Sequence, residues 1–241
     1  MLLTLDIGNT SITIGLFNGE KLDSIKRIPS NIHYSINDYK ELLTETIDSD
    51  CIDSCIIASV VNGLDKILYD AILLTFGIES IILSPNIDIG IKLKLKDNTE
   101  IGADRIANGI AAAQLYKLPV IVVDFGTANT FDIVNSKGEF IGGVIAPGIN
   151  TQLTSLSKCT SKLPKLDATI SKAAIGDNTL DAILSGVIRG TACMVEGLLS
   201  ECENEIGEKA TIVATGGNCE LISQYMNRKF DYVNPILTLQ G

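Results

Sequence analysis

Two stretches of the chain repeat one pattern, and this repeat constrains the fold more than any other feature of the sequence. In each stretch an apolar run ends in Asp, any residue and Gly, and small hydroxyl or amide residues follow: residues 2–10 contain Asp6, and residues 120–130 contain Asp124. An apolar run bounded by glycine predicts a buried strand. The glycine lets backbone approach a ligand such as phosphate. The repeat predicts a duplicated architecture with two carboxylates facing each other across a cleft.

The pattern of strands and helices supports this interpretation. After each Asp-x-Gly turn the apolar residues alternate again and reach a hairpin turn, Asn18-Gly19 in the first stretch and Lys137-Gly138 in the second. Strand and helix patterns then alternate, which is typical of an α/β domain with a mixed sheet. We therefore expect two α/β domains, residues 1–116 and 117–241.

The expected elements of both halves follow from periodicity and capping residues. In the first half we expect strands at 2–7, 11–17, 21–28, 56–61 and 80–83 and helices at 35–48, with Ser35 as N-cap, and at 64–76. In the second half a helix at 102–116 precedes strands from Val120, a helix from Ile149, a long helical stretch at 179–205, a strand at 210–214 and a helix to Met226.

Composition narrows the possible partners. The 241 residues include 19 Lys and Arg against 29 Asp and Glu, which gives a net charge of −10. Nucleic acid or an anionic membrane as main partner would be repelled by this charge. The first ten residues lack a basic start, and no run of about 18 apolar residues is present. We expect a cytoplasmic protein that binds neither nucleic acid nor membrane.

Cysteine and histidine usage points the same way. The six cysteines are an even number, but there is no Cys-x-x-Cys pair and no export signal. Reduced, mostly buried thiols are therefore favoured over disulfides. His33 is the one histidine and has polar neighbours, so a solvated loop histidine is favoured over a metal ligand or a catalytic group.

Three lysines alternate with apolar residues between positions 91 and 96. Lys92, Lys94 and Lys96 would share one side of an extended segment. An edge strand protected by its lysines is favoured over an anion-binding site.

Nucleotide binding would have to use the two Asp-x-Gly turns, because the chain has neither a P-loop nor a dinucleotide fingerprint. Backbone N–H groups and hydroxyls of Thr10, Ser11, Thr127 and Thr130 are suited to phosphate oxygens. Asp6 would hold Mg²⁺ through water, since this ion keeps several waters and takes few protein carboxylates.

Asp104 and Arg105 begin the predicted helix at 102–116. Considered alone, an acid stabilised by the helix dipole, worth ~0.3–1 kcal/mol, is the favoured interpretation. The functional alternative is a carboxylate general base beside a guanidinium that positions substrate. Thr215-Gly216-Gly217 is either a strand-to-helix turn or a place where adenine lies flat on backbone.

Six motifs resemble those of the type III pantothenate kinases in order and spacing, over nearly the whole chain. They are Asp6-x-Gly8-Asn9-Thr10, Gly102-Ala-Asp104-Arg105-Ile, Asp124-Phe-Gly126-Thr127-Ala, Gly142-Gly-x-Ile-x-Pro147-Gly148, Gly176-x-Asn178-Thr179 with Ser185-Gly186, and Thr215-Gly216-Gly217. The resemblance implies two ribonuclease-H-like domains of the acetate and sugar kinase/actin-like superfamily. It also implies a homodimer that phosphorylates pantothenate from ATP, the first step toward coenzyme A, with Mg²⁺ and a monovalent cation (K⁺ or NH₄⁺).

The resemblance also implies roles for individual residues. Asp104 resembles the proton acceptor and Asp124 the monovalent-cation ligand. ATP contacts are implied for Asp6, Gly8, Asn9, Thr10, Ser11, Thr13 and Thr127, and from the turns themselves we also expect them for Gly126, Thr215, Gly216 and Gly217. Pantothenate contacts are implied for Gly102, Ala103, Asp104, Arg105 and Thr179, the last supplied by the dimer partner.

The chain departs from the family pattern before Gly102. Where the family places Tyr and then Asp-Asn-Pro, this chain has Lys96 and then Asp97-Asn98-Thr99, one residue shorter and without Pro. Lys96 is thus the candidate substrate contact at that place. Two alternatives remain: a kinase of the same superfamily for another small hydroxyl compound, and a non-catalytic nucleotide-binding regulator.

Overall fold

The computed structural model describes residues 1–47, 52–159 and 166–241, and the chain in it forms two compact units. Unit 1 comprises Met1–Gly90, Lys96–Ala111 and Thr238–Gly241, and unit 2 comprises Ile91–Leu95 and Ala112–Leu237. The boundary at residues 116/117 stays a prediction.

Unit 1 contains a five-stranded mixed sheet in the order β3-β2-β1-β4-β5. Its strands are β1 (Leu2–Ile7), β2 (Ser11–Asn18), β3 (Lys21–Pro29), β4 (Ser54–Ser59) and β5 (Ser80–Ile82). The first three are antiparallel, whereas β4 and β5 run parallel to β1. The predicted meander is therefore confirmed.

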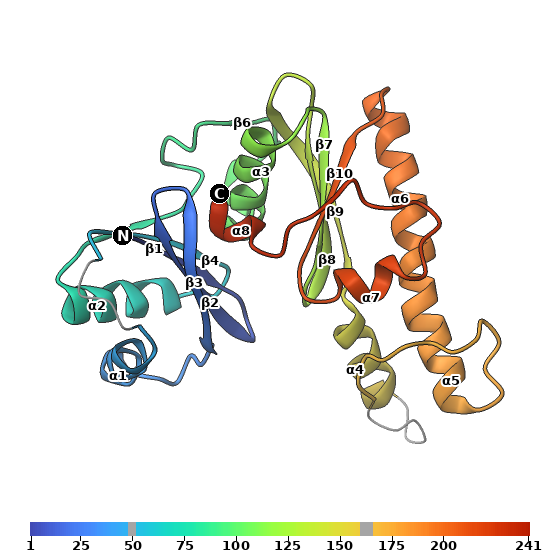
Figure 1. Ribbon diagram of the computed structural model, residues 1–241, viewed down its shortest axis with the longest axis horizontal. Coiled ribbons are helices and arrows are strands. Elements are labelled where there is room, and N and C mark those ends of the chain that lie inside the picture. Colours follow the sequence, from blue (N-terminus) through green and yellow to red (C-terminus); the bar gives the residue numbers. More distant parts are fainter. Residues whose placement is uncertain (48–51, 160–165) are drawn as a thin grey trace. The chain divides into compact units, whose positions relative to one another are not determined.

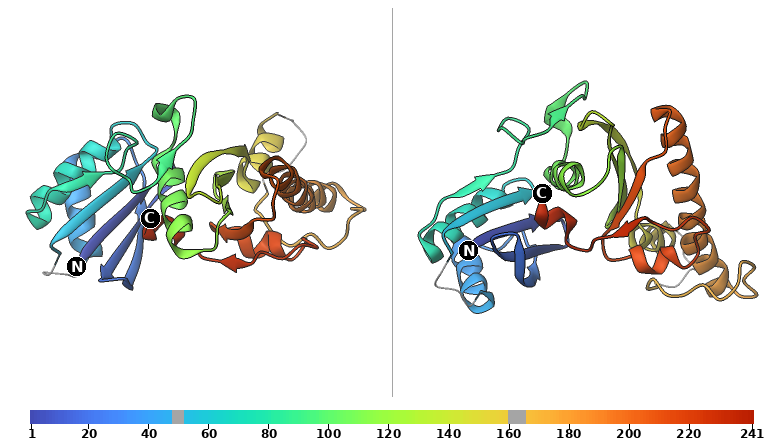
Figure 2. Two further views of the ribbon diagram at one scale, coloured as in Figure 1. Left: turned by 90° about the horizontal axis from the view of Figure 1, so that it is seen from above. Right: turned by 45° about the horizontal axis from the view of Figure 1, so that its top comes forward.

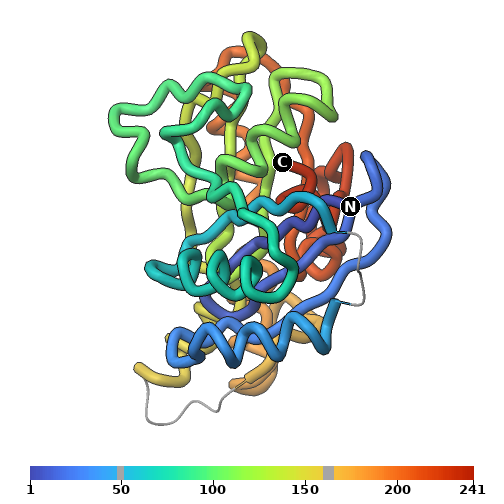
Figure 3. The backbone as a smooth tube through the Cα atoms, turned by 90° about the vertical axis from the view of Figure 1, so that its left-hand side faces the viewer, coloured from blue at the N-terminus to red at the C-terminus, as the bar shows by residue number. Residues whose placement is uncertain are grey.

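The core of unit 1 lies on one face of this sheet. Alternate residues of β1 and β2, such as Leu3, Leu5, Ile12 and Ile14, are buried there with apolar residues of two helices. These helices, α1 (Ile36–Thr46) and α2 (Leu64–Phe76), cover the same face (Figures 1 and 2) and run side by side (Figure 3). Asp6 alternates with the core residues along β1, so its side chain lies on the opposite face of the sheet.

The start of α1 has the predicted N-cap. The Ser35 side chain accepts the N–H of Asp38, and the Asp38 carboxylate accepts the N–H of Ser35 at 2.7 Å, which completes a capping box. The helix ends with Ile47 as C-cap, and the predicted end at Asp48 lies outside the described residues.

Unit 2 contains a six-stranded sheet in the order β11-β10-β7-β8-β9-β6. Its strands are β6 (Lys92–Leu93), β7 (Val120–Phe125), β8 (Ala128–Val134), β9 (Glu139–Pro147), β10 (Thr211–Thr215) and β11 (Tyr232–Val233). When β6 is left aside, the strands β7, β8, β9, β10 and β11 occupy the positions that β1, β2, β3, β4 and β5 occupy in unit 1. They also run in the same relative directions. The predicted duplication and mixed sheets are confirmed.

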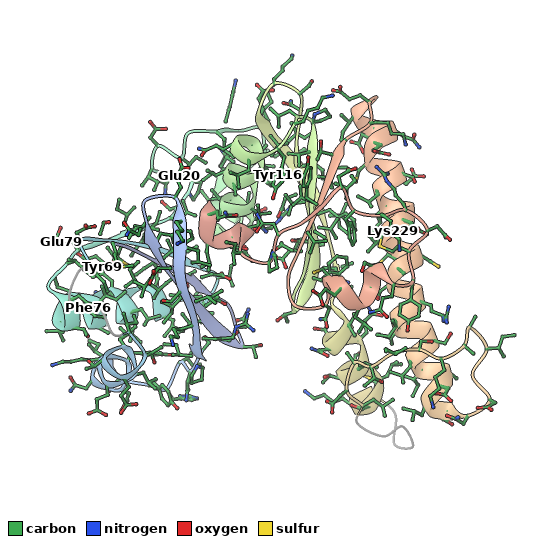
Figure 4. The ribbon with its side chains drawn as sticks, viewed as in Figure 1. Glu20, Tyr69, Phe76, Glu79, Tyr116 and Lys229 are labelled. Carbon is green, nitrogen blue, oxygen red and sulfur yellow. The ribbon has the colours of Figure 1, made fainter. Side chains whose placement is uncertain are left out.

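The other helical segments of the described residues lie between and after these strands. They are η1 (Asn98–Glu100), α3 (Ala103–Leu115), α4 (Ile149–Cys159), α5 (Thr179–Leu184), the π-helical turn η2 (Ser185–Arg189), α6 (Gly190–Ile206), α7 (Cys219–Ser223) and α8 (Leu237–Gln240). The helix predicted to reach Met226 is shorter and ends at Ser223, where Tyr225 and Met226 turn back toward the core. Tyr116, labelled in Figure 4, anchors the end of α3 within unit 2: its hydroxyl accepts Asn234 Nδ2 at 2.9 Å, and its ring lies 4.8 Å from that of Tyr232.

The long helical stretch Thr179–Ile206 is apolar enough, by length and mean hydropathy, to pass as a membrane-spanning segment. Its buried residues Val187, Ala192, Val195 and Leu199 instead pack on the apolar face of the unit 2 sheet. This contact is visible as α6 lying along β10 (Figure 1). The stretch therefore has the packing of a core helix of a soluble protein.

The lysine-rich segment forms an edge strand, as predicted. β6 pairs in parallel with the outer strand β9. Lys94 and Lys92 lie 2.8 and 3.8 Å from the carboxylate of Glu139, and these bonds, with Asn135, lower the pKa of Glu139. Two of the three lysines, Lys92 and Lys94, thus form ion pairs with Glu139.

The cysteine prediction is partly wrong. The described cysteines are free, and Cys55 and Cys219 are buried, but Cys159 and Cys193 are exposed and Cys202 is half-buried. Both exposed thiols lie on the outer faces of amphipathic helices, which the sequence pattern did not distinguish from core positions. Cys51 lies outside the described residues. His33 is exposed in a loop, as predicted.

Candidate active site

The two Asp-x-Gly turns occupy equivalent positions in the two units. Asp6 is the next-to-last residue of β1 and pairs with Thr13 of β2, and Asp124 is the next-to-last residue of β7 and pairs with Thr130 of β8. In unit 1 the Gly8 N–H closes the turn by donating to the Ser11 carbonyl at 3.1 Å. The Gly8 N–H is therefore already hydrogen-bonded within the turn. The exposed residues Asn9 and Thr10 form the tip of the turn.

The second turn is one residue shorter and has a similar closing bond. The Gly126 N–H donates to the Ala128 carbonyl at 3.0 Å, and Thr127 is exposed at the tip. The Thr127 carbonyl accepts the Gly148 N–H at 3.0 Å and the Thr151 hydroxyl at 2.7 Å. These bonds fix the turn to the start of α4 and leave the Thr127 side chain toward solvent.

Glycine is required beside Asp124. Gly216 has a φ of +87°, and a Cβ there would lie 2.5 Å from Asp124 Oδ1 and 2.6 Å from the Phe125 nitrogen. Any side chain would therefore collide with the carboxylate and with backbone. Gly148 is under a similar constraint, since its Cβ would overlap the carbonyl oxygens of Gly126 and Thr127. The sequence order Thr215-Gly216-Gly217 thus permits a close packing of β10 against the Asp124 turn.

Asp104 lies in the first turn of α3 in unit 1. Its Oδ1 accepts the backbone N–H of Arg105 at 2.8 Å, and the same N–H also lies 3.1 Å from the Gly102 carbonyl. A Cβ at Gly102 would lie 2.5 Å from Asp104 Oδ1. The carboxylate therefore folds back over Gly102, and a glycine hydrogen leaves it room to do so.

Burial raises the pKa of Asp104 above its ordinary value, and the hydrogen bond from Arg105 N–H and the Arg105 charge oppose this rise. A carboxylate with a raised pKa holds a transferred proton better than an ordinary surface aspartate does. Asp104 is thus suited to general base catalysis at neutral pH.

Contacts around Val60 place the start of α3 at the same end of the sheet as Asp6. Ile7 accepts the Val60 N–H at 3.1 Å, so Val60 lies just beyond the ends of β1 and β4. A Cβ at Gly102 would lie 3.3 Å from Val60 Cγ1. The Gly102–Arg105 segment and the Asp6 turn therefore meet at the carboxyl ends of β1 and β4, where ligands bind in open α/β sheets.

Thr179 belongs to unit 2. It is exposed at the first position of α5, which projects beyond the sheet of unit 2 (Figure 1). The Asn178 side chain caps this helix by accepting the Asp181 N–H at 2.9 Å. Gly176 packs so closely on α5 that a Cβ would overlap the Ala182 nitrogen. Of the predicted residues, the structure groups Asp6 to Thr13 with Gly102 to Arg105 in unit 1, and Asp124 to Thr127 with Thr215 to Gly217 in unit 2.

The donors present suit a hard cation bound with phosphates. Within residues 1–47, 52–159 and 166–241, no group of three or more His, Cys, Asp and Glu side chains could form a metal cage. Mg²⁺ needs no such cage when one or two carboxylates, waters and phosphate oxygens complete its shell.

Thr151 and Gly148 were not predicted as site residues. Gly148 lies within the Pro147-Gly148 motif, so the sequence contains a signal for it. Nothing in the local sequence distinguishes Thr151 from other helical threonines, and its contact with Thr127 depends on the path of β9.

The repeated sheets and their acid-bearing turns define a class of protein, the duplicated ribonuclease-H-like, or actin-like, ATPase fold. The chain belongs to the type III pantothenate kinase family, whose family model, described as "Type III pantothenate kinase", matches residues 2–201.

Sequence relatives agree with the family match. The type III pantothenate kinase of Moorella thermoacetica is 38% identical over 246 residues, covering 100% of this chain and 96% of the relative. That of Dehalococcoides mccartyi (strain CBDB1) is 40% identical over 245 residues, covering 100% and 93%.

Solved structures agree in fold. A conserved putative Baf family transcriptional activator from Campylobacter jejuni aligns with a TM-score of 0.64 at 21% identity, covering 99% of this chain and 94% of that chain. The activator of 2-hydroxyisocaproyl-CoA dehydratase from Clostridium difficile, solved with bound ADPNP, aligns with a TM-score of 0.55 at 11% identity, covering 100% and 91%. These likenesses confirm the predicted fold class.

Proposed function

We propose that this chain phosphorylates pantothenate to 4'-phosphopantothenate with ATP, the first step of coenzyme A biosynthesis. The family match supports the reaction. Within the structure, the supporting observation is Asp104, a carboxylate with a raised pKa at the sheet edge that also carries Asp6. A cytoplasmic location follows from the supply of ATP.

Asp104 accepts the proton of the primary hydroxyl of pantothenate. The freed oxygen attacks the γ-phosphorus, the bond between that phosphorus and the β–γ bridging oxygen breaks, and ADP leaves with the bond electrons. Such transfers need little covalent help from protein, so position and charge supply most of the rate. The Arg105 N–H, which donates to Asp104 Oδ1, holds the carboxylate in one orientation for this step.

The nucleotide contacts are assigned from the motifs of each turn. In unit 1, Asn9, Thr10, Ser11 and Thr13 bind phosphate oxygens beside Gly8. The family's motif assigns ATP contacts to Gly126 and Thr127 as well. Thr215, Gly216 and Gly217 receive the adenine; Thr215 is buried, whereas Gly217 is exposed and has open space around its Cα.

Two cations complete the site. Asp6 would hold Mg²⁺ through water, and Asp124 would hold K⁺ or NH₄⁺. When bound, these ions offset the phosphate charge next to the site's carboxylates. The protein's own contribution is to fix both carboxylates at equivalent strand ends.

Pantothenate contacts the Gly102–Arg105 segment, with Arg105 and Lys96 supplying positive charge for its carboxylate. Lys96 is exposed and precedes the turn η1, whose start is fixed by Asp97 accepting the Thr99 N–H at 2.8 Å. A flexible ammonium here replaces the aromatic contact that the family pattern leads one to expect.

A homodimer supplies Thr179 to the partner's site. Apolar side chains at the start of α5 and in the segment before it are exposed: Ile170 is 61%, Ile175 89% and Leu180 44% accessible. A concentration of exposed aliphatic residues of this kind is typical of an interface. Arg189 holds the segment in place through bonds to Ser171 Oγ at 3.1 Å and Ser171 O at 3.2 Å.

A coupled ADP-release assay tests the proposal, with Mg²⁺ and K⁺ present. We expect ADP release that depends on pantothenate and that falls when K⁺ is replaced by a large organic cation. A panel of other small alcohols serves as the comparison. Turnover of another alcohol with none on pantothenate would refute the assignment. Sedimentation analysis of Ile175→Glu tests the dimer: we expect a monomer with reduced turnover, and an unchanged dimer would contradict that part.

A further inference from the structure

One row of paired residues across the strands of unit 1 contains an arginine, Arg27, that the reaction above does not use. The strand registers pair Asp6 with Ala58 on β4 and with Thr13 on β2, and pair Thr13 with Arg27 on β3. Residues directly opposite each other in a sheet point to the same face. Asp6, Thr13 and Arg27 therefore share the face opposite the α1–α2 core.

The start of α3 lies on this face, on the far side of Asp6 from Arg27. Ala107 of α3 and Ala58 line the same small cavity of about 20 Å³. The Gly102 position lies against Val60, next to the end of β4. The Gly102–Asp104 segment therefore lies on the β4 side of Asp6, and Arg27 lies on the β3 side beyond Thr13.

Arg27 is close enough to share a ligand with the Asp6 turn. Two strand spacings put its Cα about 10 Å from that of Asp6, and a long side chain and a triphosphate can bridge that gap together. Arg27 is exposed. Among the described residues, no carboxylate forms an ion pair with its guanidinium.

The duplication shows that the fold itself does not require an arginine there. The equivalent row of unit 2 runs through Thr215, Asp124 and Thr130 to Ile145. Ile145 thus stands where unit 1 has Arg27. Apart from this position, both rows contain an aspartate at the strand end with a threonine opposite it.

Charge supplies the reason for an arginine in unit 1. The chain has a net charge of −10, and Asp6 and Asp104 lie at the edge where phosphates would bind. A guanidinium matches phosphate oxygens with two parallel N–H donors, and a cation at the terminal phosphates stabilises charge during phosphoryl transfer.

We propose that Arg27 binds the β- and γ-phosphates of ATP and holds the γ-phosphoryl group for attack, an inference that rests on the proposed function. Arg27 acts opposite Asp104: the arginine binds the phosphates at one end of the row, while the aspartate receives the proton at the other.

Calorimetric binding of Mg-ATP and of AMP tests the proposal on Arg27→Gln, Arg27→Lys and the control Lys26→Gln. Lys26 is the exposed neighbour on β3, pairs with Ile14 and has the opposite parity, so its loss removes the same charge from the other face. We expect Arg27→Gln to weaken ATP binding roughly tenfold, as the loss of one charged contact of about 1.4 kcal/mol implies. AMP binding should change less than twofold, Arg27→Lys should be intermediate, and Lys26→Gln should match the wild type.

Equal ATP affinity in Arg27→Gln and Lys26→Gln would overturn the proposal. An equal loss of ATP and AMP binding would also overturn it, because the effect would then be structural. This readout needs no pantothenate, so the two assignments can fail separately. Wild-type protein that binds ATP but leaves pantothenate unmodified would refute the proposed function and leave the Arg27 result interpretable.

Discussion

The carboxylate of Asp104 lies over Gly102, so that a Cβ on Gly102 would be 2.5 Å from Asp104 Oδ1. Gly102→Ala should therefore push the carboxylate away from its bond with the Arg105 N–H and out of line with the substrate hydroxyl. We expect kcat to fall by roughly tenfold or more, since small misplacements of a reacting group are costly, while ATP affinity stays within twofold. Steady-state kinetics with pantothenate and calorimetry with ATP measure the two effects.

Gly197→Ala is the matched control for this variant. Gly197 is a helical residue of α6 with open space around its Cα, so alanine there should keep activity and stabilise the helix by about 1 kcal/mol. Unchanged kcat in Gly102→Ala would show that the Asp104 position is not critical.

Asp104→Asn separates catalysis from folding. The raised pKa means that burial disfavours the ionised form, so folding stability from this group is present below the ordinary pKa and declines as pH rises through the raised one. At pH 7 the amide should thus melt at the same temperature as the wild type or higher, bind ATP normally, and lose ~10²-fold or more in kcat. For the wild type, kcat/KM should fall on acidification at a pH above the usual aspartate range. Retained turnover in the amide variant would exclude Asp104 as the base.

Gly216→Ala tests the close packing at Asp124. A methyl group there would meet both the Asp124 carboxylate and the Phe125 backbone, and the backbone lies at φ +87°. The control Gly207→Ala has a similar φ of +82° with open space, so it introduces the conformational strain without the collision. We expect Gly216→Ala to lose K⁺ activation and ATP affinity, and Gly207→Ala to lose only about 1 kcal/mol of stability. Identical behaviour of the two variants would attribute the whole effect to strain.

Glu203 stabilises unit 2 through a buried ion pair. Its carboxylate accepts both terminal nitrogens of Arg228 at 2.7 and 2.8 Å, which, with Lys209 and the Ala210 N–H, lowers its pKa to about 2 against the cost of burial. A depressed carboxyl pKa contributes stability above the unfolded value and loses it as pH falls through the folded one.

Glu203→Gln should therefore lower the free energy of unfolding by about 3 kcal/mol at pH 7. The difference from the wild type should shrink between about pH 4.5 and pH 2. Urea unfolding at several pH values measures it, with the exposed Glu201→Gln as the comparison. A difference that stays constant down to pH 2 would mean that the pair is not ionic.

The elements with strong local signals could be predicted from sequence. Alternation in β1 to β3 and β7 to β9, the Ser35 cap, and helix α2 from Leu64 to Phe76 follow from patterns within single segments. The repeated Asp-x-Gly turns gave the duplication for the same reason, since each turn contains its own signal.

Features that depend on pairing between segments could not be predicted. The alignment of Arg27 with Thr13 requires the β2–β3 register, including the irregularity at Leu16/Phe17. The contact of Thr151 with Thr127 requires the path of β9, and the π-helical turn at Ser185–Arg189 depends on the surrounding packing, including the bond from Ser185 Oγ to the Ala174 carbonyl at 2.6 Å. The site roles of single residues stay predictions that the variants above test.

The most direct test of the account is mass spectrometry of pantothenate incubated with the wild type or with Asp104→Asn in the presence of ATP, Mg²⁺ and K⁺. The account predicts that the wild type converts pantothenate to a species one phosphoryl group heavier, with one ADP formed per product, and that the variant forms ~10²-fold less while still binding ATP. ADP formation without a phosphorylated product, or equal product from both proteins, would contradict it.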